Sequence, residues 1–465
     1  MRKATLGVAA CLTLAVPLAP REAPAPLVRL APASTGSLKQ AFSAPPDTTF
    51  CKANFGFACY QPAQLRKAYN LDPLLTTGLD GTGRTIVIID AFGSPTIEED
   101  LRQFDQAFGL PDPPSLQIIQ PAGPVPPYPQ DPAGVSDRLG WAGETTLDVE
   151  WSHVFAPGAG ILLVETPTPE TEGVQGFPEI VQAENYVIDH DLGDVISQSF
   201  AATEETFPDA GAIRGLRSAF VNARRHQITV LASSGDQGAT SPLLDGCCYP
   251  FRVVGWPSSD PLVTSVGGTQ LHLDAQGNRT APDNVWNDFG AGGGGPSHVF
   301  RRPSFQDGVA SVVGDSRGTP DISMSAALDG GVDTFSSFCS SNAVDPSTGK
   351  PARCPAWHIL AGTSEGSPEL AGIVAIADQA AGRRVGWLNP DLYRLAEHHH
   401  HSGIVDIEKG SNSFGFFCSG SCGTPTETAT VVPGFQATKG YDMASGLGTL
   451  DAERFVKALA GLDAG

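Results

Sequence analysis

The sequence predicts an α/β protein, a doubly wound and mostly parallel β-sheet flanked by helices in a single domain. Short apolar runs alternate with longer segments of helical periodicity, which is typical of α/β domains. The apolar runs are continuous rather than alternating, as expected of strands buried on both faces of a parallel sheet. The 465 residues, 41% of them hydrophobic and 17% charged, have a globular composition.

The elements follow in chain order. The predicted strands are 85–89, 161–164, 195–197, 228–232 and 262–266, and the predicted helices between them are 97–108, 178–189 and 211–225. From Gly267 onward Gly and Pro become dense, so loops and hairpins are expected up to a buried apolar helix around residues 370–377.

The N-terminal region predicts export. Arg2 and Lys3 precede an apolar run too short to span a bilayer, which indicates a secretory signal over residues 1–25. Residues 26–50, rich in Ala, Pro and Ser, are expected to form a linker, and the folded domain is expected over 51–465. We therefore expect a secreted, extracellular protein.

The cysteines agree with an oxidising compartment. Of nine cysteines, Cys11 lies in the signal, and eight remain as four close pairs. Local disulfides are expected for Cys51 with Cys59, Cys247 with Cys248, Cys339 with Cys354, and Cys418 with Cys422. The adjacent pair either forms a strained vicinal ring or each cysteine pairs elsewhere.

The charge limits the partners. A formal net charge of −21 and the lack of a basic run argue against nucleic acid and anionic membranes. The acidity fits solubility alone, and it also fits a protein that works in acid, where many of the carboxylates are protonated.

Two distant segments predict chemistry. In the first, Glu144 and Asp148 are four residues apart, so a helix stacks them on one face, and Trp151 and Phe155 continue that face as an apolar stripe. Acids at the edge of a core are costly unless they are paired or used. Pro157 is expected to close this helix.

The second segment is Gly362-Thr363-Ser364, at the start of the apolar helix, where Pro368 is tolerated in the first turn. A hydroxyl there lies at the positive end of the helix dipole, which favours developing negative charge. Each segment alone also fits an ordinary solvated helix or a turn. Together they predict a serine peptidase whose base is a carboxylate.

A Ser-His-Asp triad is the main rival arrangement. His153 lies nine residues after Glu144, on the opposite side of the same helix, and Asp90 ends the first predicted strand. The run of histidines at 398–401 fits a metal site less well than a loop.

Ordered motifs over most of residues 51–465 resemble the sedolisin family, serine-carboxyl peptidases with a subtilisin-like fold. The resemblance rests on many short matches in the same order along the chain. They are Gly143-Glu144 with Asp148, Ala156-Pro157-Gly158-Ala159, Ser233-Ser234-Gly235-Asp236, Tyr249-Pro250, Val266-Gly267-Gly268-Thr269, Val285-Trp286-Asn287, Arg317-Gly318-Thr319-Pro320-Asp321, Gly362-Thr363-Ser364, Leu388-Asn389-Pro390, Asp406-Ile407, Gly440-Tyr441-Asp442 and Gly446-Leu447-Gly448.

The resemblance implies that Ser364 is the nucleophile, Glu144 the general base and acid, Asp148 its partner, and Asp236 the acid of the oxyanion site. It implies a monomeric acid endopeptidase that acts on proteins or peptides. A carboxylate base suits acid, where imidazole is already protonated. The competing interpretations are a catalytically silent secreted binding protein on the same scaffold and a neutral Ser-His-Asp peptidase.

Three departures from the family pattern stand out. Relatives carry a long folded pro-domain, whereas only about 25 to 30 residues separate the expected signal from the core here. Relatives often have Trp where this chain has Phe200, which lacks a donor for the acid network, so Asp90 is expected to stand alone at that edge. Glu365 replaces a small residue after the nucleophile, and it either modulates the site or faces away.

The resemblance also implies one structural Ca²⁺ near the C-terminus. Asp406 and Asp442 would supply carboxylates, and Ile407, Thr438 and Gly440 would supply backbone oxygens, a hard-oxygen set of the kind Ca²⁺ requires. No Cys or His takes part, which disfavours zinc.

Overall fold

A computed structural model describes residues 36–37, 41–126, 135–244, 247–338, 353–397, 402–416 and 430–461. Its centre is an eight-stranded sheet in the order β11-β10-β8-β6-β3-β5-β4, with β14 also paired to β10. All neighbours are parallel except β10 and β11, which confirms the predicted fold class. The strands are β3 (Thr85–Ala91), β4 (Leu116–Ile119), β5 (Gly160–Thr166), β6 (Val195–Gln198), β8 (Thr229–Ser233), β10 (Thr264–Gln270), β11 (Asn284–Val285) and β14 (Ile322–Ser325).

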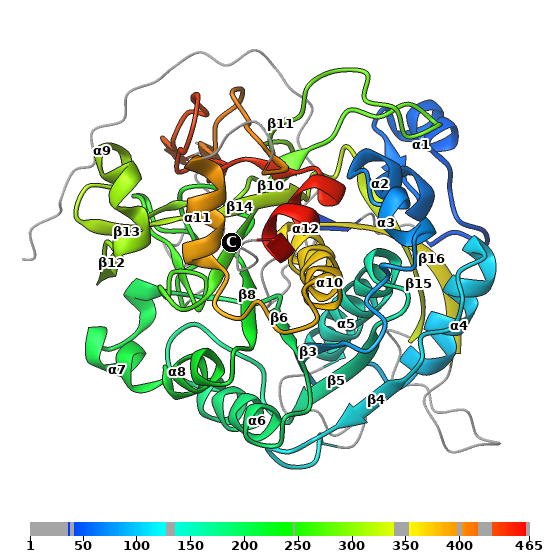
Figure 1. Ribbon diagram of the computed structural model, residues 1–465, viewed down its shortest axis with the longest axis horizontal. Helices are drawn as coiled ribbons and strands as arrows, with labels where there is room; N and C mark the ends of the chain where they lie inside the picture. Colours follow the sequence, from blue (N-terminus) through cyan, green and yellow to red (C-terminus); the bar gives the residue numbers. More distant parts are fainter. Residues whose placement is uncertain are drawn as a thin grey trace, which may run out of the picture.

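Helices and smaller sheets surround this sheet (Figure 1). The helices are α1 (Thr48–Phe55), α2 (Pro62–Ala68), α3 (Asp72–Thr76), α4 (Ile97–Phe108), α5 (Val135–Phe155), α6 (Phe177–Asp189), α7 (Ala210–Gly215), α8 (Ser218–Arg225), α9 (Ala310–Val313), α10 (Thr363–Ala381), α11 (Asn389–Glu397) and α12 (Ala452–Gly461). A second sheet has the order β1 (Gly36–Ser37), β16 (Arg353–Ala361), β15 (Gly331–Phe338) and β2 (Cys59–Tyr60). The two-stranded sheets pair β7 (Ala202–Thr203) with β9 (Gly255–Trp256), β12 (Gly295–Arg301) with β13 (Ser316–Thr319), β17 (Ile404–Val405) with β20 (Thr449–Leu450), and β18 (Phe414–Phe416) with β19 (Thr430–Val432).

The central sheet is covered on both faces. Successive side chains of a strand point to opposite faces. Ile86 and Ile88 of β3 accordingly join the core that contains α5 and α10, whereas Val87 and Ile89 join the core that contains α6 and α8. Figure 1 shows α5 and α10 together near the centre of the view and α6 and α8 at its lower edge. Burial on both faces explains the continuous apolar runs in the sequence.

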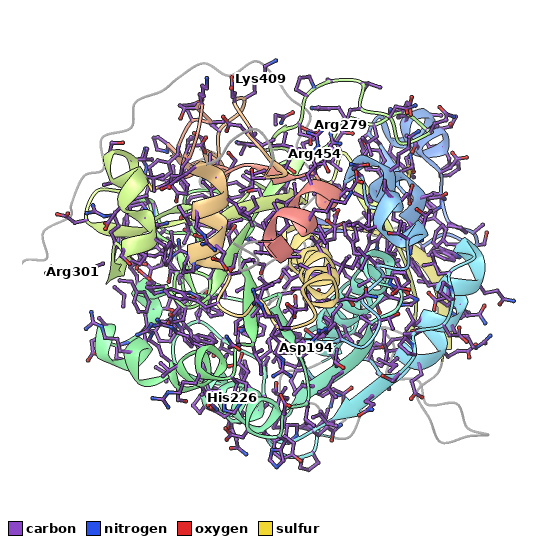
Figure 2. The ribbon with its side chains drawn as sticks, viewed as in Figure 1. Asp194, His226, Arg279, Arg301, Lys409 and Arg454 are labelled. Atoms are coloured by element: carbon purple, nitrogen blue, oxygen red, sulfur yellow. A yellow bond between two sulfur atoms is a disulfide. The ribbon has the colours of Figure 1, made fainter. Side chains whose placement is uncertain are left out.

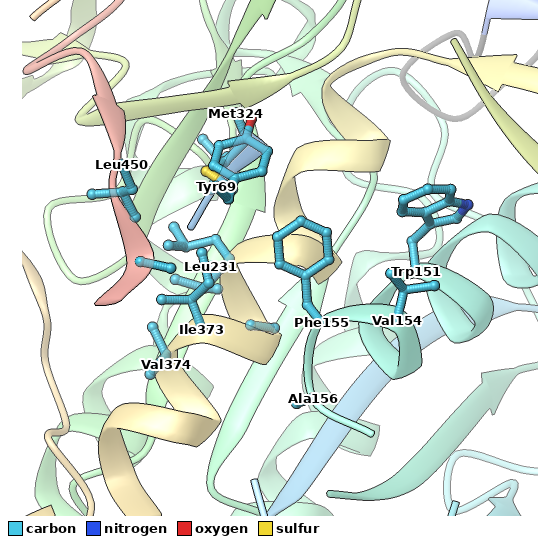
Figure 3. Close-up of a cluster of buried hydrophobic side chains, with 14 of the residues drawn as sticks. Tyr69, Trp151, Val154, Phe155, Ala156, Leu231, Met324, Ile373, Val374 and Leu450 are labelled. Carbon is cyan, nitrogen blue, oxygen red and sulfur yellow. The ribbon is translucent and has the colours of Figure 1, made fainter. Parts of the chain in front are cut away.

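Helices α5 and α10 pack closely against each other. A Cβ added at Gly372 of α10 would lie 2.6 Å from the Cβ of Phe155 in α5, so only glycine permits this approach. Figure 3 shows Phe155 between the two helices, in one cluster with Ile373 and Val374. This contact fixes α10 relative to α5 and thereby positions the residues one to three turns earlier on each helix.

Two predicted elements differ from the structure. The single helix expected over 211–225 is two helices, α7 and α8, separated at Leu216 and Arg217. Gly215 weakens helix continuity there, and Arg217 turns to Asp260, with its Nη2 2.8 Å from Oδ1. In the region expected to be loops, β14 is a further parallel strand of the core, and only two of its residues are apolar.

The expected linker ends earlier than predicted. Helix α1 begins at Thr48, and the Asp47 carboxylate caps it by accepting the amide of Phe50 at 2.7 Å. Phe42 pairs with Trp357 of β16 through two backbone hydrogen bonds of 2.9 Å. Residues 41–50 thus belong to the folded domain, because they complete its second sheet and first helix. The expected signal lies outside the described residues.

The described cysteines confirm one predicted disulfide and correct another. Cys51 is bonded to Cys59. Cys247 is disulfide-bonded while Cys248 is a free thiol, so these two neighbours do not form the vicinal ring, which would be strained. Cys354 is disulfide-bonded too, but Cys339, Cys418 and Cys422 lie outside the described residues.

Some charged side chains lie at the outside of the molecule. Arg301 and Lys409 project from the edge of the ribbon in Figure 2. Among the described helices, none combines the length and apolarity needed to cross a membrane.

Candidate active site

Ser364 lies in the first turn of α10, at the end of strand β16. The chain turns into the helix at Gly362, whose φ of 136° is a conformation that side chains other than glycine rarely adopt. The Gly362 amide donates to the carbonyl of Ala326 at 2.8 Å, which fixes this turn on the segment directly after β14. Ser364 is fully buried at the positive end of the helix dipole.

The two acids of α5 face Ser364 across the helix seam. Glu144 and Asp148 are both completely buried. Burial raises the pKa of Glu144 well above its usual range, and the Ser364 hydroxyl lowers it in part by hydrogen bonding. That contact is looser than an ordinary hydrogen bond, since neither Glu144 oxygen has a partner at normal distance among the described residues. Such contacts are often long before substrate binds.

Asp148 is the inner partner of this pair. Burial raises its pKa well above the usual range, and the neighbouring Asp90 and Glu144 raise it further. The Ser199 hydroxyl donates to Asp148 Oδ1 at 2.9 Å and lies 3.4 Å from the Ser364 carbonyl oxygen. Ser199 therefore connects the acid of α5 to the start of α10.

Asp236 approaches the start of α10 from the loop after β8. Its Oδ1 accepts the Thr363 amide and the Thr363 hydroxyl, both at 2.8 Å. Its Oδ2 has no hydrogen-bond partner among the described residues. Burial raises the pKa of Asp236 to about 7, although the Thr363 bonds lower it. In acid the carboxyl is therefore neutral, and with Oδ1 occupied by two donors its proton belongs on Oδ2.

Asp90 extends the acids away from the nucleophile. Burial raises its pKa to about 7, the Thr145 hydroxyl lowers it, and Glu165 raises it. Phe200 is buried and packs on Trp141 with 6.3 Å between ring centroids, so it contributes no donor to the acids. The prediction that Asp90 stands alone is wrong, because Glu165 lies beside it on the neighbouring strand.

His153 does not belong to this site. Its Nε2 lies 2.7 Å from the Pro111 carbonyl oxygen and 3.4 Å from Asp105 Oδ1. Burial lowers the pKa of His153 to about 4. The structure thus agrees with the prediction from helical phase that this imidazole points away from Glu144. The run 398–401 lies outside the described residues.

Glu365 faces away from the predicted catalytic acids. It is fully buried, and the Ser325 hydroxyl lowers its pKa while burial raises it well above the usual range. Glu369, four residues on, is buried beside it, and its pKa is raised by burial and by Glu365. Of the two alternatives for Glu365, the structure favours the one in which it faces away.

The structure brings the predicted calcium residues together. The Gly440 amide donates to Asp406 Oδ2 at 2.7 Å, and the Thr438 amide donates to Asp442 Oδ2 at 2.8 Å. The neighbouring Ile407 is buried and anchors Asp406. Among the described residues, Asp442 Oδ2 accepts this one amide and so keeps a lone pair for a cation, and carboxylate oxygens are of the ligand type that Ca²⁺ requires. Within the described ranges, no three His, Cys, Asp or Glu side chains cluster as metal ligands.

Sequence reasoning missed the hydroxyl groups that hold the acids. Ser199 follows a predicted strand, and Thr363 precedes the predicted nucleophile, but neither position has a spacing that links it to its acid. Glu165 could have been predicted as a neighbour of Asp90. It lies at the end of the strand next to that of Asp90, and the carboxyl ends of parallel strands meet at one edge of the sheet.

A covered parallel sheet, a serine at the start of a buried helix and a buried carboxyl pair facing that serine define the class of serine-carboxyl peptidases. No protein-family model matches the chain. Kumamolisin of Bacillus sp. (strain MN-32) is 30% identical over 417 residues, covering 86% of this chain and 63% of kumamolisin. Sedolisin of Pseudomonas sp. (strain 101) is 26% identical over 475 residues, covering 90% and 72%.

Other relatives and a solved structure agree. Tripeptidyl-peptidase sed4 of Aspergillus fumigatus is 30% identical over 389 residues, covering 76% of this chain and 59% of sed4. The chain thus spans about three fifths of the length of kumamolisin and sed4. The solved structure of Pseudomonas sedolisin, a serine-carboxyl proteinase, aligns with a TM-score of 0.65 and 25% identity over 87% of this chain and 99% of that one. The chain belongs to the sedolisin family, as its motifs predicted.

Proposed function

We propose that this protein is an acid-acting serine-carboxyl peptidase that hydrolyses peptide bonds through an acyl-enzyme. The observation that carries the proposal is the approach of the Ser364 hydroxyl to Glu144, the outer acid of a fully buried carboxyl pair. A serine hydroxyl needs a positioned base to become a nucleophile. Glu144 is the titratable group whose pKa the Ser364 hydroxyl alters.

In the first step the Ser364 oxygen attacks the substrate carbonyl while its proton moves to Glu144. Asp148, oriented by Ser199, shares that proton as coupled acids do. Glu144 then returns the proton to the leaving amine, and water attacks the acyl-enzyme by the reverse path. Each proton transfer thus uses the same buried pair.

Asp236 is the proposed oxyanion donor. Neutral Asp236 has a proton on Oδ2 and can donate it to the oxygen of the tetrahedral intermediate. This role requires Asp236 to be protonated, so activity is expected to fall as pH rises through about 7, the pKa to which burial raises this group. Glu144 must be ionised to act as base, which sets the acid limb of activity.

The proposed substrates are proteins and peptides, cleaved by a monomer as an endopeptidase. Tripeptidyl-peptidases occur among the relatives, so the mode of cleavage requires a direct test. An internally quenched peptide with an acetylated N-terminus distinguishes the two, because a tripeptidyl-peptidase needs a free amino terminus. We also propose secretion, supported by the basic-apolar N-terminus and by the Cys51–Cys59 disulfide, which suits an oxidising compartment.

The test of the catalytic proposal is digestion of an unfolded protein from acid to neutral pH by wild type and Ser364→Ala. Ser367→Ala is the matched control, since Ser367 is a buried serine on the same helix that pairs with Ser197 at 2.8 Å. We expect wild type and Ser367→Ala to digest the substrate in acid and Ser364→Ala to be inert. Digestion by Ser364→Ala would refute the assignment, and an inert wild type would favour a silent binding protein.

We also propose one structural Ca²⁺ held by Asp406 and Asp442 with backbone oxygens of Ile407, Thr438 and Gly440. The ion would join the loop that carries Asp406 to the loop that carries Asp442, which the Gly440 amide already connects to the Asp406 carboxylate. Its loss should cost about 2.7 kcal/mol when the ion exceeds its dissociation constant a hundredfold. A chelator should therefore lower the melting temperature, and Asp442→Ala should abolish that response. A melting temperature indifferent to chelation would exclude the ion.

A further inference from the structure

Glu165 lies directly beside Asp90 in the central sheet. The two residues are register partners on the parallel strands β5 and β3. By strand alternation both side chains belong to the face that carries α5 and α10, because Ile88 and Leu163, two residues earlier on each strand, join that core. The carboxyl of Glu165 is therefore a neighbour of the acids that face Ser364.

The surroundings of Glu165 hold its carboxyl in one place. Gln120 Nε2 donates to Glu165 Oε2 at 2.7 Å. The turn after Asp90 is folded over the other oxygen, because a Cβ added at Gly93 would lie 1.9 Å from Glu165 Oε1, and Gly93 has a φ of 64°. Only glycine fits that position, so the turn leaves room for this carboxyl.

A cation lies on the outer side of Glu165. Arg138, two turns before Glu144 on α5, stacks its guanidinium 4.7 Å from the ring centroid of Phe92 and donates to the Pro126 carbonyl. Burial raises the pKa of Glu165, and the Gln120 hydrogen bond and the charge of Arg138 each lower it in part. Four acids lie next to one another here, namely Glu165, Asp90, Asp148 and Glu144. Of these four, Glu165 is the one with an amide donor and a cation on its outer side.

We propose that Glu165, held by Gln120 and near the charge of Arg138, is a positioning residue for the proposed catalytic acids and directs negative charge to the Glu144–Asp148 pair rather than to Asp90. The inference rests on the proposed function. It assigns a role to a carboxyl that touches neither Ser364 nor, on the proposed mechanism, the substrate.

The charge of Glu165 acts on Asp90, and Asp90 in turn acts on the Glu144–Asp148 pair. Asp90, on β3, interacts with Glu165 on the neighbouring strand β5. It also interacts with three residues of α5, namely Thr145, Asp148 and Glu144. An ionised Glu165 disfavours a second charge on Asp90, so Asp90 stays neutral. A neutral Asp90 in turn leaves the inner pair free to ionise, because a charge on Asp90 raises the pKa of both Glu144 and Asp148.

The test compares the pH dependence of kcat/KM for wild type and Glu165→Gln. Without the charge of Glu165, Asp90 ionises first and opposes ionisation of the Glu144–Asp148 pair. The acid limb of the kcat/KM profile should therefore shift to higher pH by about 0.5–1 pH unit. On the steep part of that limb the shift appears as a loss of about 3- to 10-fold at fixed pH. Activity on the plateau should change less than activity on the limb.

Two further variants keep the test decisive. Arg138→Gln removes the cation and should move the limb in the same direction by a smaller amount, and it serves if Glu165→Gln does not fold. Glu184→Gln is the matched control, because Glu184 is a buried acid on α6 whose pKa burial alone raises to about 8, and it should leave the limb unmoved. A folded Glu165→Gln enzyme with an unmoved or lowered acid limb overturns the inference. An inactive wild type would instead overturn the proposed function.

Discussion

Two buried carboxyl pairs lie on two packed helices, and one of them faces Ser364, the proposed nucleophile. Glu144 and Asp148 on α5 and Glu365 and Glu369 on α10 have the same four-residue spacing and are all fully buried. Burial raises the pKa of each of the four well above its usual range. The raised pKa alone therefore does not mark a catalytic acid.

The difference lies in what surrounds each pair. The α5 pair has hydroxyl groups from Ser364 and Ser199 on it, both tied to the start of α10. The α10 pair has the Ser325 hydroxyl beside Glu365, whereas Ser364, the proposed nucleophile, faces the α5 pair. A buried carboxyl pair can thus act in catalysis when a reactive hydroxyl faces it, and otherwise it only makes the stability of the fold depend on pH.

The largest expected effect separates the pairs by activity. Glu144→Gln removes the base and should lower kcat/KM at the acid optimum by roughly 10²- to 10⁴-fold, the contribution of general acid–base catalysis. Glu365→Gln, the matched change on the other helix, should retain wild-type kcat/KM, because Glu365 faces away from Ser364. Steady-state assays of the two variants decide the matter. Equal losses in both would mean that the pairs are not functionally distinct.

The next effect concerns the third acid, Asp236. Asp236→Ala should lower kcat by about 10²- to 10³-fold, the usual effect of losing one oxyanion donor. Asp236→Asn can still accept the Thr363 bonds at Oδ1 and donate through its amide at every pH. We therefore expect it to keep much of its activity and to lose the fall in activity near pH 7 that titration of Asp236 causes. If its neutral limb matched that of wild type, another group would control that limb.

A smaller effect is expected on stability, and it should come from the α10 pair. A carboxyl whose folded pKa is raised stabilises the fold below its unfolded pKa, and this stabilisation is lost as pH rises toward the folded pKa. Glu369→Gln removes this loss, so it should raise the melting temperature at pH 7 by about 2–4 °C, the shift that about 1 kcal/mol causes in a large domain. At pH 4 the variant should have the same melting temperature as wild type.

The control for that measurement is Glu98→Gln, an exposed acid on α4. It should leave the melting temperature unchanged at both pH values. A Glu369→Gln variant that is no more stable than wild type at pH 7 would show that the pair remains neutral there or is hydrated.

The smallest expected effect is at Phe200. Phe200→Trp places an N–H donor at the edge of the catalytic acids, and a donor favours the ionised form of a carboxyl. The acid limb of kcat/KM should move to lower pH by a few tenths of a unit, provided that the larger ring fits beside Trp141 and Phe177, both at 6.3 Å. An unchanged profile would show that the acids are insensitive to this edge.

Much of the site could be predicted because its signals are local. The four-residue spacing of Glu144 and Asp148, followed by the apolar stripe, predicted an acid pair on one helix face at the edge of a core or cleft, and the position of Ser364 at the start of an apolar helix predicted the nucleophile. The same spacing occurs at Glu365 and Glu369, but it predicts no role for that pair, since nothing in the local sequence shows which side of α10 packs against α5. The place of Gly372 against Phe155 decides that question, and it is a contact between segments over two hundred residues apart.

The rest depended on distant contacts. Asp236 could be assigned only through the family resemblance, because its partner Thr363 is 127 residues away. Strand β14 escaped prediction because half of its residues are serines, and the partner of Ser323 is distant in the sequence: Ser323 Oγ donates to the Ser445 carbonyl at 3.0 Å. Polar residues can be predicted to lie inside a core only once their hydrogen-bond partners are known.

Thr363 also has a mechanical consequence. It is the covalent neighbour of Ser364 and at the same time holds Asp236 through its amide and its hydroxyl. Consecutive Cα atoms are separated by about 3.8 Å. A tilt or slide of the start of α10 is therefore expected to move Ser364, the proposed nucleophile, together with Asp236, the proposed oxyanion donor, so that motion of this helix changes how a substrate is seated while the distance between the two groups is preserved.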